Sequence, residues 1–465
     1  MGSCSRPLLI ILSLSVFFLL CESSQKAFRG NAKRVHVTNV NSLRPSAACS
    51  VSKGVKQRGL TVSHRFGPCS PLGKKKVSTR QILLHDQARV NSLQSRYSNV
   101  SSRIFRDEKT TTLPANLGVA VGVLNYVVTV KLGSLNKEMT VAFDTGSDLT
   151  WVQCHPCSGC YKQRDPYFNP ADSTSYVGIT CNSPECSSLP SGTGRPASCS
   201  SSQCYYSTSY GDGSETEGFY GQDTLTLASD AIPSFRFGCG RNNRGLFGET
   251  AGLLGLGRDD LSLVSQTAQK YGKVFSYCLP SSSSDAGFLT FGPGTNSEAK
   301  FAPLVTNSDA PGFYFVQLVG LKVGGEDLDV PPSAFSSPGT ILDSGTVITR
   351  LPPAAYAALR SAFRRQLSNY TLAEPYQIFD TCYDFSAFET LDIPTIGLRF
   401  GGGVEVEMTV TGIVYFVKST QVCLAFAGNS DPEDLAIIGN RQQRTYEVVH
   451  DVAGGRIGFA AGGCS

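Results

Sequence analysis

The sequence predicts an all-β protein of two related β lobes with a cleft between them and few short helices. Glycine is frequent, with 47 residues, and short runs of Val, Thr, Phe and Tyr alternate with turns rich in Gly, Asn and Ser. Stretches with helical periodicity are few. A motif also occurs twice, as Asp-Thr-Gly-Ser at 144–147 and as Asp-Ser-Gly-Thr at 343–346, each directly after a short apolar run. The repetition indicates an internal duplication in which each lobe carries one copy.

Each motif places one carboxylate, Asp144 or Asp343, at the point where a predicted strand leaves the core. An apolar pair followed by glycine comes later in each half, within 251–257 and 436–440. Two acids within hydrogen-bond distance cannot both ionise easily, so one keeps a proton while the other can draw a proton from water. A single motif is typical of a strand-end turn. Two copies, each followed later by its own apolar pair and glycine (the echo of the motif), favour a hydrolytic pair of carboxylates that needs no metal and no cofactor.

The first 23 residues predict a secretory signal, because Arg6 precedes an apolar run from Leu8 to Leu20 and small residues follow it. The run is shorter than the ~20 apolar residues that a spanning helix needs. A signal anchor is the alternative. We expect secretion and no membrane span.

Residues 24–112 form a basic segment, with 18 Lys or Arg against three acidic residues, a net charge of +15. From residue 113 onward the chain has 22 Lys or Arg against 33 Asp or Glu, a net charge of −11. A cationic segment over an acidic cleft binds at neutral pH and weakens as carboxylates protonate, which predicts a self-inhibiting prosegment released between roughly pH 5 and 3 and more readily at high salt. Apolar positions from Ile82 to Leu93 predict one amphipathic helix in it. A solvated arm and a nucleic-acid-binding arm are the alternatives; we expect no nucleic-acid partner.

The body offers further local signals. Residues 126–133 predict a strand, and residues 205–214 predict a strand entering an Asp-Gly hairpin turn, which would make a mobile lid or a purely structural hairpin. Residues 352–363 are the clearest predicted helix, and 259–266 a short one with acidic capping residues. Asn369 and, in the basic segment, Asn99 begin glycosylation acceptor motifs.

The body contains an even number of cysteines, twelve, and seven of them fall within residues 154–204. Their spacing is compatible with zinc binding or redox chemistry, but in a secreted chain structural disulfides are favoured. The spacing alone leaves the connectivity open. Cys49 and Cys69 could pair within the basic segment.

These motifs resemble those of the pepsin-like aspartic proteases, and above all the plant nepenthesin-type group, from about residue 113 to the end. The resemblance implies an N-terminal lobe at 113–298 and a C-terminal lobe at 299–465. It also implies disulfides between Cys154 and Cys157, Cys160 and Cys239, Cys181 and Cys204, Cys186 and Cys199, Cys278 and Cys464, and Cys382 and Cys423.

The resemblance further assigns roles to motif residues. Asp144 and Asp343 would be the catalytic pair, with Gly146 and Gly345 letting the backbone turn close behind them. Thr145 and Ser344 would lock the two loops together, while Ser147 and Thr346 would hydrogen-bond the outer carboxylate oxygens. Tyr210 and Gly211 would belong to the flap, and Trp151, the only tryptophan, would support it.

The predicted function is therefore an endopeptidase, made as a zymogen, that acts on protein or peptide substrates at acidic pH as a monomer outside the cell, in the apoplast. The vacuole is an alternative compartment, and the chloroplast of the nucleoid DNA-binding relatives is less favoured by the apolar leader. A Ser-His-Asp or Cys-His enzyme is disfavoured because the body contains only His155 and His450. The serious competitor is a pepsin-fold protein that has lost activity and serves as an inhibitor or binding module.

Overall fold

The computed structural model describes residues 33–43, 46–50, 59–73, 77–103, 125–210, 213–245, 247–294 and 298–464. The predicted leader at 1–23, the expected start of the N-terminal lobe at 113 and the flap residue Gly211 lie outside these ranges.

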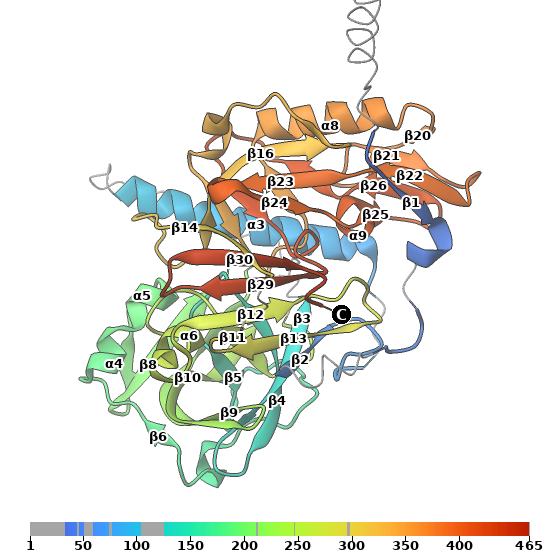
Figure 1. Cartoon of the computed structure of the whole chain (residues 1–465). Helices are drawn as coiled ribbons and strands as arrows, with labels where there is room; N and C mark the ends of the chain where they lie inside the picture. Colours follow the sequence, from blue (N-terminus) through green and yellow to red (C-terminus); the bar gives the residue numbers. More distant parts are fainter. Residues whose placement is uncertain are drawn as a thin grey trace, which may run out of the picture.

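The structure is mostly β, with two lobes and short helices, as predicted (Figure 1). The N-terminal lobe contains β3 (Tyr126–Leu132), β4 (Lys137–Asp144), β5 (Trp151–Gln153), β6 (Val177–Gly178), β7 (Ser198–Ser200), β8 (Gln203–Ser209), β9 (Glu215–Leu227), β10 (Asp230–Arg244), β11 (Gly252–Gly255), β12 (Val274–Cys278) and β13 (Ala286–Phe291). Its helices are α4 (Pro184–Ser187), α5 (Leu189–Thr193), α6 (Leu263–Gln266) and α7 (Ala268–Tyr271).

The C-terminal lobe is also mostly β. Its strands are β14 (Lys300–Val305), β15 (Phe315–Val316), β16 (Leu318–Val323), β17 (Glu326–Asp327), β18 (Thr340–Leu342), β19 (Thr349–Leu351), β20 (Leu372–Ala373), β21 (Cys382–Asp384), β22 (Thr390–Pro394), β23 (Ile396–Phe400), β24 (Val404–Glu407), β25 (Val414–Phe416), β26 (Gln421–Leu424), β27 (Phe426–Gly428), β28 (Ala436–Ile438), β29 (Tyr446–Asp451) and β30 (Arg456–Ala461). Its helices are α8 (Pro353–Gln366) and α9 (Val410–Ile413).

One network of paired strands joins the lobes. β12 pairs antiparallel with β13 and with β29, and β29 pairs with β30, so strands of both halves share a sheet at the centre of the molecule (Figure 1). Alternating burial along β9 and complete burial of β11 are typical of a sheet with one wet face and of an interior strand, respectively. The shared sheet fixes the two lobes, and therefore the two motifs, relative to each other.

The predicted helix at 352–363 is confirmed as α8, which begins after Pro352 and buries Tyr356, Leu359 and Phe363. The prediction at 259–266 is only partly right. Helix α6 covers just Leu263–Gln266, because the Ser262 hydroxyl accepts a hydrogen bond from the backbone N–H of Ser265 and so caps the helix there.

The described part of the basic segment packs on the body instead of forming a solvated arm. Strand β1 (Val35–Asn39) pairs antiparallel with β22, and β2 (Leu60–His64) lies between β13 and β3. Helix α3 (Thr79–Arg103) runs between the two lobes (Figure 1). Leu83 and Leu93 on α3 are buried against the body as expected, but Leu84 is 47% exposed.

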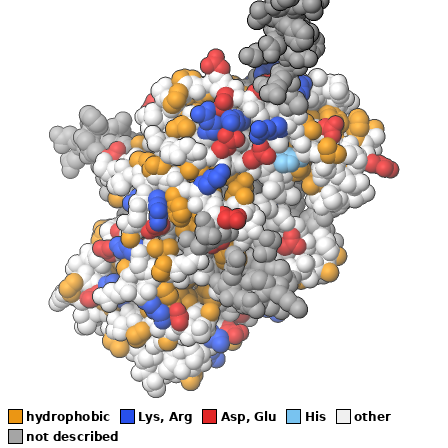
Figure 2. All heavy atoms as spheres, in the orientation of Figure 1, with side chains coloured by type: hydrophobic (Ala, Val, Ile, Leu, Met, Phe, Trp, Pro, Cys, Tyr) orange, Lys and Arg blue, Asp and Glu red, His pale blue; other side chains and the backbone are white. Residues whose placement is uncertain are grey.

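The surface in Figure 2 shows Lys and Arg side chains interspersed with Asp and Glu over the C-terminal lobe. Exposed ion pairs also join oppositely charged residues, for example Arg34 with Glu407 and Arg399 with Asp327. Such pairs contribute little to stability individually. Within the described residues, no helix is both long and apolar enough to cross a membrane.

Seven disulfides join the described cysteines, and four of the six predicted body pairings were wrong. The N-terminal lobe instead has Cys154–Cys239, Cys157–Cys160, Cys181–Cys199 and Cys186–Cys204. The predicted Cys278–Cys464 and Cys382–Cys423 pairs are confirmed, and Cys49 bonds Cys69.

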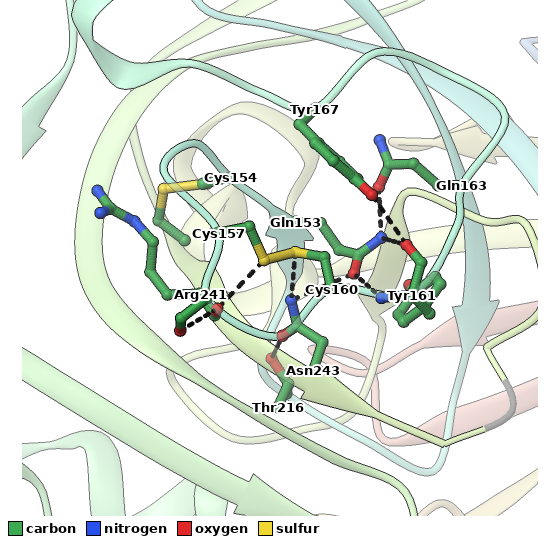
Figure 3. The surroundings of a disulfide bond; sticks show 12 residues. Gln153, Cys154, Cys157, Cys160, Tyr161, Gln163, Tyr167, Thr216, Arg241 and Asn243 are labelled. Carbon is green, nitrogen blue, oxygen red and sulfur yellow. Dashed lines mark hydrogen bonds between the residues drawn. A yellow bond between two sulfur atoms is a disulfide. The ribbon is translucent and has the colours of Figure 1, made fainter.

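Strand pairing explains the difference. β5 runs parallel to β10, and the Cys154 backbone N–H donates to Gly240, which sets Cys154 beside Cys239 and leaves Cys157 and Cys160 to close a short loop (Figure 3). In the second set, the buried Cys186 and Cys204 bond each other, and the pair nearer the surface forms the other bridge. Residue spacing carries no information on either contact.

Candidate active site

Each lobe presents its motif in the same way. β4 ends at Asp144 and pairs in parallel with β11, while β18 leads to Asp343 and pairs in parallel with β28. The echo of each motif is therefore the strand that lies beside the motif strand. Asn440, just after β28, also donates its side-chain amide to the Ser344 carbonyl at 3.0 Å, and the echo thus fixes the second loop.

The two motif loops meet across the lobe interface, as the resemblance implied. The Ser344 backbone N–H donates to Thr145 Oγ1 at 2.9 Å, and the Thr145 backbone N–H donates to Ser344 Oγ at 3.2 Å. Both hydroxyls are buried, so these bonds stabilise one fixed spacing of Asp144 and Asp343.

Gly146 and Gly345 provide the room that this spacing needs. A Cβ on Gly146 would lie 2.7 Å from Asp343 Oδ1, and a Cβ on Gly345 would lie 2.7 Å from Asp144 Oδ1. Each glycine thus makes space for the carboxylate of the opposite lobe. Neither requires a positive φ, so close approach rather than turn conformation explains the residue type.

The hydroxyls expected on the outer carboxylate oxygens behave differently in the two lobes. Thr346 Oγ1 donates to Asp343 Oδ2 at 2.6 Å, as predicted. Ser147 lies near Asp144, but its buried hydroxyl makes no hydrogen bond among the described residues. It still lies close enough to Asp144 to help lower the pKa of that carboxyl, beside the bonds that Asp144 accepts from Arg89.

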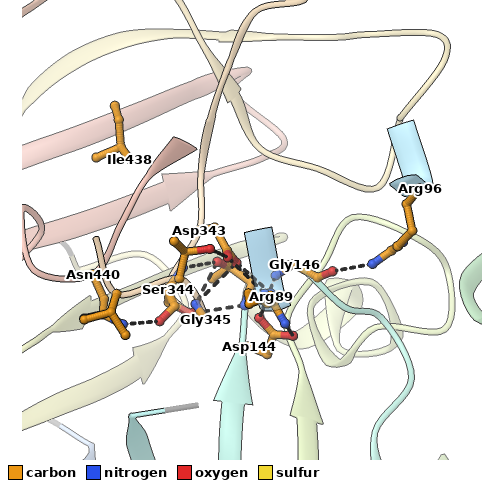
Figure 4. Close-up of polar contacts among 12 residues, drawn as sticks. Arg89, Arg96, Asp144, Gly146, Asp343, Ser344, Gly345, Ile438 and Asn440 are labelled. Carbon is orange, nitrogen blue, oxygen red and sulfur yellow. Dashed lines mark hydrogen bonds and ion pairs between the residues drawn. The ribbon is translucent and has the colours of Figure 1, made fainter. Parts of the chain in front are cut away.

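Arg89 of helix α3 occupies the space between the two carboxylates (Figure 4). It donates from Nη1 and Nη2 to the Asp144 oxygens at 3.0 and 2.7 Å, and from Nη2 and Nε to the Asp343 oxygens at 2.9 and 3.2 Å. Its side chain is 11% exposed. Sequence reasoning predicted a basic segment over an acidic cleft but did not find this residue, because Arg89 is one of 18 cations in that segment and no spacing rule singles it out.

Other residues of α3 beyond Arg89 also contact the two lobes. Arg96 donates to the Gly146 carbonyl at 2.9 Å (Figure 4), and Gln94 exchanges hydrogen bonds with the backbone of Leu435. Val90 and Leu93 pack in one apolar cluster with residues of the C-terminal lobe, including Phe313. These polar and apolar contacts hold α3 over the carboxylate pair.

The charge of Arg89 alters the proton affinity of Asp144. Burial acts to raise the pKa of the Asp144 carboxyl, but the Arg89 guanidinium, its hydrogen bonds and the Gly146 N–H together hold the pKa below its ordinary value of 3.8. The same carboxylates raise the pKa of Arg89. The arrangement with α3 in the cleft therefore favours an ionised Asp144.

The predicted flap is the β8–β9 hairpin. Tyr210 stands at its shoulder, where its backbone N–H donates to the Ser214 carbonyl, and its ring packs edge-on against Phe247. Trp151 Nε1 donates to the Tyr210 hydroxyl at 2.8 Å, and Trp151 is completely buried. The contact is the one expected of a residue that supports the flap.

A cavity of about 350 Å³ remains beside α3, lined mainly by the N-terminal lobe and also by residues 309–313 of the C-terminal lobe. Tyr210, Phe247, Asp148, Arg96 and Phe313 are among its lining residues. Burial raises the pKa of the Asp148 carboxyl to about 7, so this lining group is mostly protonated in acid. The cavity is large enough for substrate side chains.

Of the two predicted glycosylation sites, one has a described side chain. Asn369 is exposed after α8, whereas the side chain of Asn99 lies outside the described residues. Within the part of the chain that the structure describes, no group of three or more His, Cys, Asp or Glu could hold a metal ion.

Comparison with known proteins shows the family and the fold. Residues 126–293 match the family model "Xylanase inhibitor N-terminal", and residues 313–461 match "Xylanase inhibitor C-terminal". An aspartyl protease family protein of Arabidopsis thaliana is 50% identical over 92% of this chain and 93% of its own length. Aspartic proteinase nepenthesin-1 of Nepenthes gracilis is 36% identical over 78% of this chain and 84% of its own length.

Solved structures share the fold. The protein described as edgp matches with a TM-score of 0.60 at 21% identity, covering 72% of this chain and 91% of that chain. Basic 7S globulin from soybean matches with a TM-score of 0.57 at 21% identity, covering 72% and 90%. The fold and the two-acid site define a pepsin-like protein. This chain belongs to the pepsin-like aspartyl protease family whose members include the nepenthesins.

Proposed function

We propose that this protein is an aspartic endopeptidase that is made as an inactive zymogen and acts on proteins or peptides at acidic pH. The observation that carries the proposal is the Arg89 side chain of α3, which donates to both carboxylates of an otherwise complete pair. The geometry supports a working pair held closed by the chain's own prosegment.

The chemistry follows from the pair once α3 has left. One carboxylate is ionised and the other protonated, because two negative charges on neighbouring carboxylates repel each other. The ionised acid takes a proton from water as the water attacks the peptide carbonyl, and the protonated acid donates to the carbonyl oxygen. The lock between Thr145 and Ser344 holds the two acids in place, and Tyr210 at the hairpin shoulder would close over the substrate.

Acid would release the prosegment by a defined route. A carboxyl whose pKa is lowered in the docked state stabilises docking above its ordinary pKa, and this stabilisation is lost as the pH falls from that value through the lowered, docked pKa. For Asp144 the loss begins near 3.8 and continues below it. Protonation weakens the attraction to Arg89, and the remaining cations of the segment repel one another.

The compartment is part of the proposal. Seven disulfides among the described cysteines are typical of an oxidising environment, and with the predicted leader they support secretion to the apoplast, with the vacuole as the alternative. We propose a monomer whose partners are its substrates and its own prosegment.

A non-catalytic binding protein is the second candidate. The matching family models are named for xylanase inhibitors, and a solved structure with this fold is basic 7S globulin from soybean. Those descriptions belong to those proteins. Here both acids, both motif glycines and the hydrogen bond between Trp151 and Tyr210 are present, which favours catalysis.

Expression of the full-length proform followed by acidification tests the proposal. We expect peptidase activity to appear with loss of the prosegment, and pepstatin to abolish it. A folded, acid-treated protein that cleaves no peptide in a diverse mixture would support the binding-protein alternative instead.

A further inference from the structure

A second buried contact between α3 and the body lies one helical turn from Arg89. Asp86 accepts hydrogen bonds from the backbone N–H groups of Val347 and, at 3.3 Å, Ile348, and from Arg350 Nη2 at 3.0 Å. The Asp86 side chain is fully buried, and that of Arg350 is 2% exposed. A carboxylate thus sits in a closed cradle of three donors.

The cradle itself belongs to the catalytic body. Val347 and Ile348 directly follow the Asp343 motif, and Arg350 lies on β19. Arg350 Nη1 donates to the Ile348 carbonyl at 2.7 Å, which fixes the guanidinium with Nη2 pointing to the carboxylate. Of the described residues, Asp86 is the only one with a carboxylate within 4 Å of Arg350.

Loss of the prosegment would empty this cradle. A buried arginine without an anion is unfavourable, and charge-assisted hydrogen bonds to a carboxylate are among the stronger polar contacts. The two backbone N–H groups beside the Arg350 guanidinium orient a bound carboxylate, because all three donors face one concave site. In the cradle, burial raises the pKa of the Asp86 carboxyl, and Arg350 and the two N–H groups oppose that rise. The body therefore retains a preorganised site for a carboxyl group when Asp86 leaves.

We propose that Arg350 and the backbone N–H groups of Val347 and Ile348 form a substrate subsite that binds an acidic side chain, and that Asp86 of the prosegment occupies it in the zymogen. The inference rests on the proposed peptidase function and deepens it by naming a substrate class, peptides with Asp or Glu near the cleaved bond. Arg350 is a specificity-determining residue in this scheme and takes no part in bond cleavage.

The helix gives the approximate position of the subsite. Asp86 and Arg89 are three residues apart and so share one face of α3, with a rise of about 4.5 Å between them. An extended peptide advances about 3.3 Å per residue, so the subsite falls within about three residues of the scissile bond.

The test uses the acid-activated full-length protein, assayed afterwards at about pH 5, where a free Glu side chain is mostly ionised. Peptide pairs that differ only by Glu or Gln are compared at each of several positions on both sides of one cleavage site. The wild type should favour Glu at one position by at least about tenfold in kcat/KM, the size of a charge-assisted hydrogen bond.

The variants remove the cradle without leaving a buried charge. In the double variant Asp86→Asn with Arg350→Gln, an amide pair replaces the ion pair, and the Glu:Gln ratio should fall to about one. Arg399→Gln removes an exposed arginine of the same lobe and should keep the wild-type ratio. Circular dichroism checks that both variants are folded.

The outcomes separate the two proposals. Equal cleavage of Glu and Gln peptides at every position by the wild type would overturn the subsite and leave the peptidase proposal intact. A Glu preference that survives in the double variant, or that Arg399→Gln also loses, would overturn the role of Arg350. If the wild type cleaves no peptide, the peptidase proposal fails and the subsite fails with it.

Discussion

Replacing Arg89 with Met should open the zymogen at a higher pH. The change removes the cation that donates four hydrogen bonds to Asp144 and Asp343 but keeps a long apolar side chain on α3. Removing one partner from a buried charge network costs about 3–5 kcal/mol. The lower end applies here, because the two acids can relieve their repulsion by sharing a proton.

A loss of about 3 kcal/mol weakens docking of the prosegment by about a hundredfold. In the wild type, release needs protonation of Asp144, whose docked pKa lies below 3.8, so the wild type should open near pH 4 and below. The variant lacks the cation that lowers this pKa and holds the segment, so its prosegment should already leave at a pH above the wild-type transition.

Cleavage of a quenched fluorescent peptide by freshly diluted proform, measured from pH 7 to 3, gives both transitions. Arg80→Met is the matched control, since Arg80 is exposed on the same helix and should leave the transition unchanged. Arg89→Lys should lie between the two, because one ammonium cannot form the same fork of bonds. An Arg89→Met proform that needs the same acidity as the wild type would refute the role of Arg89 in holding the prosegment over the two carboxylates.

Salt dependence, the support of Tyr210 by Trp151 and the disulfide pairing give three further predictions. Added salt should shift the wild-type transition much less than Arg89→Met does, because the Arg89 pair is buried and poorly screened; a shift of comparable size would indicate diffuse attraction instead. Trp151→Phe should lower kcat/KM by roughly tenfold with little change in fold, since the Tyr210 hydroxyl loses its 2.8 Å donor, and unchanged kinetics would remove the supporting role of Trp151. Peptide mapping of the non-reduced proform should recover the four N-terminal-lobe disulfides in the observed pairing, and thiol titration after denaturation should find no free thiol among them.

The parts of the site that could be predicted from the sequence are those encoded locally. A strand end, a motif and its echo determine where Asp144 and Asp343 lie, because strand pairing within each lobe brings motif and echo together. The Thr145–Ser344 lock was found through the resemblance and is present. The all-β, two-lobed fold follows from the same short, alternating runs.

The parts that could not be predicted depend on contacts between distant segments. Cys154 bonds Cys239 across the β5–β10 pairing, which no local spacing reports. Arg89 and Asp86 reach the cleft because they share one face of α3 and that helix crosses the molecule. Net charge predicted attraction between the basic segment and the acidic body. It could not predict which residues make the contacts, because these depend on how α3 lies between the lobes.

The account depends most directly on the two acids acting together. We would measure hydrolysis of one fluorescent peptide at about pH 3.5 by mature wild-type protein and by the Asp343→Asn protein, the latter freed of its prosegment by an added protease. The account predicts a loss of at least about a thousandfold in kcat for the variant, with an unchanged circular dichroism spectrum. Turnover by the folded variant at a rate near that of the wild type would contradict it.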